Sequence, residues 1–198
     1  MIKSLDLDSI SISILSNARK ELIHMLKIVK YPAAILKKKA KEVRGITPDL
    51  LSLISCMELA MEKNQGVGLA APQVGFSRQI FVVKDDKKSR AFFNPKIRSQ
   101  SRQRSEDEEG CLSLPGLFVL VKRAERVRVS CNTKEGKPVV VEAEGLASRI
   151  FQHEIDHLQG KLIIDRITPF QRWKIRKQLQ EIKQKGRTQQ NTSMHLVH

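Results

Sequence analysis

The stretch LASRIFQHEIDHLQG, residues 146–160, carries the strongest structural signal in this sequence. Its apolar positions recur at helical spacing and Gly160 supplies a stop, so we predict a helix. Residues four apart on a helix lie one turn above each other, so His153 and His157 can offer ring nitrogens to one metal ion. Glu154 then reaches a water beside that ion. The alternative is that both histidines are half-buried residues with a purely structural role.

A catalytic metal site of this type needs a third protein ligand and one open position. Ile163 stands where an extended HExxHxxGxxH motif would place a third histidine, so that pattern is excluded. Glu181 is the only acid far enough downstream, and it lies in a strongly basic segment. Cys111, in EGCLSLPG at 109–116, offers a thiolate, which is a strong ligand for zinc or iron. From the residues alone, Cys111 and Glu181 both remain candidates.

Length and composition favour one globular domain. The chain has 198 residues, 40% of them hydrophobic, which is enough to bury a core and argues against global disorder. Three cysteines are too few for a disulfide framework and favour a reducing compartment. No apolar run reaches membrane-spanning length, and the acids Asp6, Asp8 and Glu21 argue against an organelle transit peptide. We therefore expect a soluble cytoplasmic protein.

The charge is strongly basic but unevenly placed. Lys and Arg number 36 against 21 acids, a net charge of +15, which raises nucleic acid as a partner. Residues 166–198 carry eight basic side chains against the single acid Glu181, whereas residues 110–165 are nearly neutral. Aromatic residues make up only 5% of the chain, and no RNA-binding motif is present. A non-catalytic RNA-binding protein is therefore the weaker interpretation.

The remaining pattern predicts an α+β fold. A first helix begins at the cap Thr47-Pro48-Asp49 and ends at Asn64-Gln65-Gly66. The other predicted elements are strands at 79–84 and 91–97, a solvated stretch at 98–107, a hairpin from the β-rich runs 119–133 and 137–144, and a basic amphipathic helix at 169–185. We expect a single domain with antiparallel or mixed β-sheets around the central helix that carries HExxH, plus a C-terminal helix.

Three segments together resemble the signature motifs of the peptide deformylases. They are GVGLAAPQVG (66–75), EGCLSLPG (109–116) and QHEIDHLQG (152–160), in this order. The resemblance begins near Met25 and ends near residue 185. It implies a deformylase-like catalytic domain at 25–185, preceded by an N-terminal extension of uncertain status at 1–24 and followed by a disordered tail at 186–198.

The resemblance implies a hydrolase that removes the N-formyl group from the initiator methionine of nascent polypeptides. Cys111, His153 and His157 would hold one divalent ion with a water as fourth ligand. Members of the family are similar in preferring Fe²⁺, while Zn²⁺ or Ni²⁺ can occupy the site. The ion would activate the water and polarise the formyl carbonyl, and Glu154 would act as general base and then general acid.

Two uncharged donors would stabilise the oxygen that becomes negative. The resemblance assigns this role to the side-chain amide of Gln73 and the backbone N–H of Leu112. The small Gly66 and Gly68 would let the loop backbone pair with an extended peptide. An apolar slot would take the methionine side chain. The predicted substrate-binding residues are Gly66, Val67, Gly68, Glu109, Gly110, Leu146 and Ile150.

Five further residues carry weaker predictions. Asp156 could orient a ligand or pair with Arg123. Asp107 and Arg149 are charged at positions that flank the expected pocket, and we predict that they pair across its rim. Phe118 follows the Cys111 motif and could alter contacts to the second residue of the substrate.

The motifs weigh against the other functions. A zinc endopeptidase using His153, His157 and Glu181 has one motif in its favour. If the chain is an enzyme, its basic charge does not mark an RNA-binding protein. Instead, the helix from residue 169 would hold the enzyme near ribosomal RNA at the exit tunnel, where N-formylmethionyl nascent peptides emerge. Formylated initiation implies a bacterium or an organelle derived from one, and no membrane partner is expected.

Overall fold

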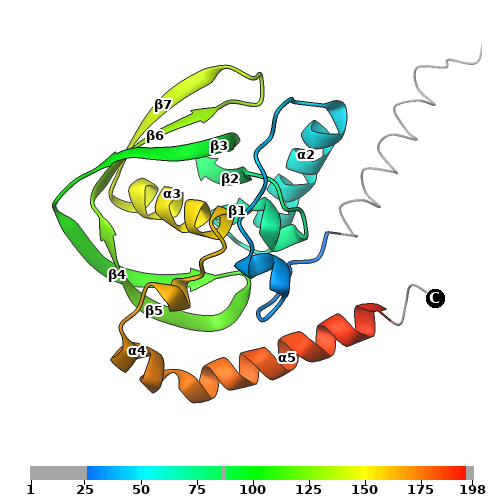
Figure 1. The fold of residues 1–198 in the computed structure, drawn as a ribbon, viewed down its shortest axis with the longest axis vertical. Coiled ribbons are helices and arrows are strands. Elements are labelled where there is room, and N and C mark those ends of the chain that lie inside the picture. The colour runs from blue at the N-terminus through cyan, green and yellow to red at the C-terminus, as the bar shows by residue number, and fades with distance from the viewer. Residues whose placement is uncertain (1–25, 86–87, 195–198) are drawn as a thin grey trace, which may run out of the picture.

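The computed structural model describes residues 26–85 and 88–194. The predicted extension at 1–24 lies outside these residues. The described chain forms two antiparallel sheets and four α-helices, with short 3₁₀ turns between them (Figure 1). The predicted α+β class is confirmed. None of the helices in these two ranges has the length and apolar character needed to span a membrane.

The larger sheet has five strands in the order β1-β2-β3-β6-β7. These are β1 (Gly68–Ala70), β2 (Ile80–Asp85), β3 (Lys88–Gln100), β6 (Arg126–Asn132) and β7 (Pro138–Glu144). The second sheet is the hairpin of β4 (Arg104–Cys111) and β5 (Leu114–Ala124). Because β1 is an edge strand, one side of its backbone pairs with β2 and the other side has no partner strand in this sheet.

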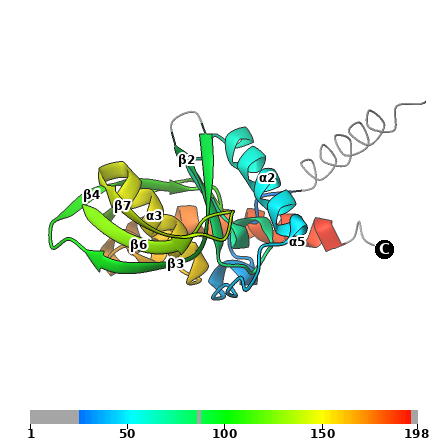
Figure 2. The same ribbon diagram turned by 90° about the horizontal axis from the view of Figure 1, so that it is seen from above.

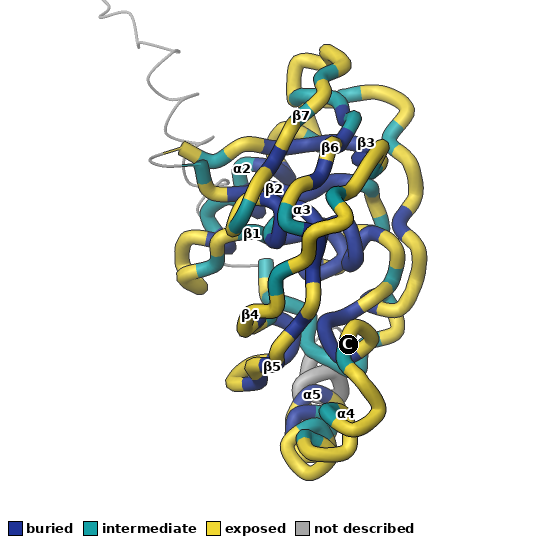
Figure 3. Tube along the Cα trace, turned by 90° about the vertical axis from the view of Figure 1, so that its left-hand side faces the viewer, coloured by how far each residue is buried: buried dark blue, intermediate teal, exposed yellow. Residues whose placement is uncertain are grey.

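Helix α3 (Gly145–Leu158) is the central element, as predicted (Figure 2). The large sheet and the β4–β5 hairpin lie on different sides of it. Phe151 anchors the helix: its ring packs edge-on against Phe81 of β2 at 5.3 Å and also contacts Phe92 of β3. Such buried aromatic pairs contribute about 0.5–1.5 kcal/mol beyond their area. Figure 3 shows the buried segments at the centre of the molecule, around α3 and β2.

Two buried polar side chains of α3 bind it to the end of β5. Gln152 accepts a hydrogen bond from the Ala124 N–H and donates one to the Ala124 carbonyl oxygen, and Ser148 donates to the same oxygen. These bonds hold the corner where β5 ends and β6 begins. The β-rich run 119–133, predicted as one arm of a hairpin, is therefore divided between two sheets, and the hairpin itself is formed by β6 and β7.

The first predicted helix is confirmed as α2 (Pro48–Lys63), with the Thr47 hydroxyl accepting from the N–H of Leu50. The stretch at 98–107 is largely exposed, as predicted, but most of it forms strands, because β3 continues to Gln100 and β4 begins at Arg104. Because its side chains are largely exposed and polar, nothing in the sequence indicated that the backbone of this stretch pairs with neighbouring strands.

The C-terminal helix is longer than predicted and is divided in two. Helix α4 (Pro169–Lys174) and helix α5 (Arg176–Met194) meet at Ile175. Thus 186–194, predicted to be disordered, is helical; residues 195–198 lie outside the described chain. Ile175 and Ile182 pack with the buried face of β5, which holds α5 beneath the β4–β5 hairpin (Figure 1).

Candidate metal centre

Three side chains from two elements place their ligand atoms together. Cys111 ends β4, while His153 and His157 lie one turn apart on α3. Their ligand atoms are all within 4.8 Å of one another, and Cys111 Sγ lies 3.2 Å from His157 Nε2. Glu181 is exposed on α5 and does not belong to this group. Tertiary structure therefore favours Cys111 over Glu181 as the third ligand.

Charge within the group favours the thiolate of Cys111, which is the form that binds a metal ion, whereas His153 must give up a proton before its ring can bind the ion. Burial by itself raises the pKa of the Cys111 thiol, but the nearby His157 and His153 outweigh it and hold the pKa well below its usual range. The pKa of His153 lies well above its usual range, because hydrogen bonds to Cys111 and Glu109 outweigh its burial. A thiolate and two imidazoles are a donor set suited to iron, zinc or nickel.

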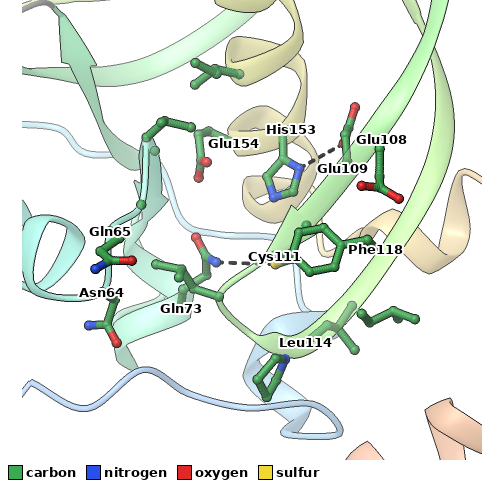
Figure 4. Close-up of a pocket in the computed structure, with 18 of the residues that line it drawn as sticks. Asn64, Gln65, Gln73, Glu108, Glu109, Cys111, Leu114, Phe118, His153 and Glu154 are labelled. Carbon is green, nitrogen blue, oxygen red and sulfur yellow. Dashed lines mark hydrogen bonds and ion pairs between the residues drawn. The ribbon is translucent and has the colours of Figure 1, made fainter.

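Glu154 lies beside this group and is almost fully buried. Burial raises its pKa to about 7, against the opposing effect of His153 and His157. Its Oε2 has no hydrogen-bond partner among the described residues. A buried carboxylate oxygen without a partner is costly, so this atom fits a site where a water or substrate must be contacted. Figure 4 shows Glu154 and His153 pointing into the same space.

Glu109 contacts His153 through the ring nitrogen Nδ1. Its Oε2 lies 3.0 Å from His153 Nδ1, and Arg123 donates to both carboxylate oxygens at 2.9 Å. Burial opposes ionisation of Glu109, but hydrogen bonds from Arg123 and His153 lower its pKa to about 2. The carboxylate therefore orients the ring of His153, an arrangement common around metal-binding histidines.

The same network includes three of the residues with weaker predictions, which are Arg123, Asp156 and Arg149. Arg123 also donates to Asp156 at 2.5 Å, which confirms the predicted Asp156–Arg123 pair. The predicted pair between Asp107 and Arg149 was wrong. Arg149 donates to Glu109 at 2.8 Å and to the Val121 carbonyl, whereas Asp107 is exposed and accepts from the Glu108 N–H. Arg149 lies on α3 and is buried against the β4–β5 hairpin, so its guanidinium contacts Glu109 rather than the exposed Asp107.

Gln73 reaches the centre from the other side. It lies in a 3₁₀ turn (Ala71–Val74) directly after β1 and is buried. Its Oε1 accepts from the Ala70 N–H at 2.8 Å, which turns the amide nitrogen toward Cys111 Sγ at 3.6 Å (Figure 4). The donor predicted for a developing negative charge thus faces the centre.

A cavity of about 540 Å³ opens onto these groups, a size typical of ligand sites. All the predicted site residues except His157 line it. Phe118 and Arg149 line it as well. Sequence reasoning missed the other residues on the wall, which are Lys30, Asn64, Gln65, Glu108, Leu114, Pro115, Gly116 and Leu117. Lys30 is the most notable of these, because it is half-buried and its Nζ donates to the Leu112 carbonyl oxygen at 2.7 Å.

The two glycines of the first motif have different neighbours. A Cβ at Gly66 would lie 3.0 Å from Leu112, and one at Gly68 would lie 2.4 Å from Oε1 of Glu154. The prediction for both was close approach to a peptide. At Gly68 there is a second reason for glycine, because a larger side chain would clash with the carboxylate of Glu154.

Comparison with known proteins agrees with this geometry. A family model described as polypeptide deformylase matches residues 25–173. The peptide deformylase of Thermodesulfovibrio yellowstonii is 44% identical over 158 residues, 77% of this chain and 95% of the relative. A crystal structure of a peptide deformylase from Legionella pneumophila is 41% identical with a TM-score of 0.74, covering 80% of this chain and 95% of that one. A peptide deformylase structure from Plasmodium falciparum has a TM-score of 0.78 at 37% identity, covering 82% and 98%.

Proposed function

The chain belongs to the peptide deformylase family and is a hydrolase that removes the N-formyl group from nascent polypeptides, and we propose that it does so at the Cys111–His153–His157 centre. The observation that carries the assignment is the placement of these three ligand atoms within 4.8 Å, beside the partnerless Oε2 of Glu154.

The donor set fits a catalytic divalent ion. Three protein ligands leave a position open, which distinguishes catalytic from structural sites. We propose Fe²⁺ as the native ion, with Zn²⁺ or Ni²⁺ able to replace it in the same donor set. When bound, a divalent ion polarises a carbonyl and makes a water more acidic.

Glu154 moves the proton in this proposal. Its carboxylate is buried next to His153 and opens onto the cavity, within reach of a water at the centre. It takes a proton from the attacking water and later returns it to the leaving amine. Because Gly68 has no side chain, the carboxylate can keep this position.

Gln73 and Leu112 stabilise the oxygen on which negative charge develops. The amide nitrogen of Gln73 points at the centre, and Leu112 lies in the turn directly after Cys111. Donors that are held in place before the reaction are worth more than mobile ones, because they need no reorganisation.

The cavity wall accounts for binding of an extended formyl-methionyl peptide. Gly68 begins the edge strand β1 and Gly66 lies two residues before it, so an extended peptide can add along this edge as a further strand. Val67, Leu146 and Ile150 provide apolar surface for the methionine side chain. Glu109 and Gly110 also line the cavity, and Phe118 packs over Gly110.

The activity test is formate release from formyl-Met-Ala, with protein purified without oxygen because Fe²⁺ and a thiolate both oxidise. We expect Glu154→Gln to lower kcat by about 10²-fold or more while bound metal is retained. Cys111→Ala should lose both metal and activity. Glu181→Gln is the matched control and should behave like wild type. Loss of activity in Glu181→Gln with an active Cys111→Ala variant would contradict the assignment.

The basic C-terminal helices provide the second part of the proposal. Apart from Glu181, their charged residues are all basic, and most of these are exposed, so we propose that they hold the enzyme near ribosomal RNA in the cytoplasm of a bacterium. Replacing Lys177, Lys185 and Arg187 by Gln should weaken salt-sensitive co-sedimentation with ribosomes. The control replaces three exposed lysines elsewhere, which are Lys134, Lys137 and Lys161. Equal co-sedimentation of both variants and wild type would contradict the proposal.

A further inference from the structure

A short segment before the first helix joins the two loops that carry the proposed oxyanion donors. The Val29 N–H donates to the Gln73 carbonyl oxygen at 2.7 Å. Two residues later, the Tyr31 N–H donates to the Ser113 carbonyl oxygen at 2.9 Å. One extended stretch of backbone thus fixes the loop after β1 relative to the turn between β4 and β5.

Lys30, between these two residues, makes a second bond to the turn between β4 and β5. Its Nζ donates to the Leu112 carbonyl oxygen at 2.7 Å, a contact that joins residues 82 positions apart. The side chain is half-buried and lines the cavity. A charged donor makes a stronger hydrogen bond than a neutral one, so this bond restrains the turn more than the neighbouring backbone bonds do.

The side chain of Gln73 holds the turn from the opposite direction. Its Nε2 donates to Ser113 Oγ at 3.4 Å as well as toward Cys111 Sγ. The turn that contains Leu112 is therefore held by Lys30 and Tyr31 on one side and by Gln73 on the other. Its peptide planes have little freedom to rotate.

We propose that Lys30 is a positioning residue, which holds the turn so that the Leu112 N–H and the Gln73 amide converge on one developing negative charge. This inference rests on the proposed roles of Gln73 and Leu112. Oxyanion donors act only at about 2.7–3.1 Å from the charged oxygen, and a misplacement of about 1 Å can cost about 10²-fold in rate. A lysine that only fastened the N-terminal segment would affect stability and leave kcat unchanged.

Lys30→Met tests the proposal, because methionine keeps an apolar stem and removes the donor. Lys27→Met is the matched control, since Lys27 is exposed in the same segment. With iron-loaded enzyme and formyl-Met-Ala, we expect Lys30→Met to lower kcat by about 10- to 100-fold and to change KM less than about threefold. Metal content should match that of Lys27→Met, whereas the thermal midpoint should be lower, because a charged hydrogen bond is lost. Lys30→Arg, which retains a charged donor, should recover most of kcat.

The possible results distinguish a failure of the role proposed for Lys30 from a failure of the oxyanion roles proposed for Gln73 and Leu112. Wild-type kcat in Lys30→Met, together with a slow Gln73→Ala variant, would overturn the role of Lys30 alone. Loss of metal in proportion to kcat would also overturn it, because Lys30 would then act on the ligands. Wild-type kcat in Gln73→Ala would contradict the proposed oxyanion donors and Lys30 with them. Should Lys30→Met fail to fold, Lys30→Gln is measured in its place with the same expectations.

Discussion

Gly68 of β1 and Glu154 of α3 approach each other so closely that a Cβ on Gly68 would lie 2.4 Å from Oε1 of the carboxylate. The first and third sequence motifs are therefore in direct contact here, because Gly68 has no side chain and the Glu154 carboxylate occupies the space beside it. The atom that a larger residue would strike is the end of a flexible side chain, so the protein can relieve the clash by moving Glu154.

Gly68→Ala should therefore reduce activity more than stability. We expect kcat for formate release to fall by about 10²-fold, because the proton-transferring carboxylate is displaced. Metal content should be unchanged. Gly45→Ala is the control, since no atom lies within 4 Å of the added Cβ. Full activity of Gly68→Ala would contradict the role assigned to Glu154.

Gly186, within the C-terminal helix α5, makes an even closer contact, with the backbone of Tyr31. A Cβ there would lie 2.0 Å from the Tyr31 carbonyl oxygen, which belongs to the backbone and cannot easily move. Replacing glycine by alanine inside a helix normally stabilises a protein by about 1 kcal/mol. Here we expect the opposite sign, a loss of about 1–3 kcal/mol in the free energy of unfolding from overpacking. Urea denaturation measures it, with Gln184→Ala, at an exposed position on α5, as control.

Glu109→Gln should weaken both the fold and the metal site. The buried carboxylate accepts from Arg123, Arg149 and His153, and an amide cannot satisfy three such donors. Removing one partner of a buried ion pair costs about 3–5 kcal/mol. Loss of the group that orients a metal-binding histidine lowers metal affinity about 10- to 100-fold.

The matched control for this change is Glu106→Gln, which alters an exposed acid on the same strand. Competition with a chelator measures the metal affinity, and denaturation measures the stability. If Glu109→Gln binds metal as tightly as Glu106→Gln, then Glu109 does not orient His153.

The buried thiol of Cys131 should make the protein less stable at alkaline pH. Burial raises the pKa of this thiol, on β6, to about 11. Between the ordinary thiol value near 9 and about 11, the folded protein keeps a proton that the unfolded chain has lost. The free energy of unfolding must then fall as pH rises through this window, by about 2–3 kcal/mol. Below and above it, this group adds no pH dependence.

Cys131→Val removes the titrating group and keeps an apolar side chain suited to a strand. We expect the difference in unfolding free energy between wild type and Cys131→Val to shift in favour of the variant from pH 9 to pH 11. Denaturation series at both pH values measure it. A constant difference would show that the thiol ionises freely in the folded protein.

The sequence by itself determined the α+β class, helix α2 with its Thr47 cap, helix α3, and the family. These depend on local periodicity, capping residues and motif spacing, which neighbours in the chain specify. The motifs also contained almost every residue of the cavity wall that the resemblance assigned to the site.

Tertiary structure decided which charges meet. Asp107 and Glu109 lie two residues apart on β4 and so share a face, yet Arg149 pairs with Glu109, because Glu109 is buried in the packed core of the molecule whereas Asp107 is exposed. The contact between Lys30 and Leu112 spans 82 positions, so no local pattern signals it. Packing against Tyr31 likewise requires Gly186 within α5, where the sequence alone indicated the start of a disordered tail. Pairings of this kind depend on how distant elements bury one another, and that is settled only when the chain has folded.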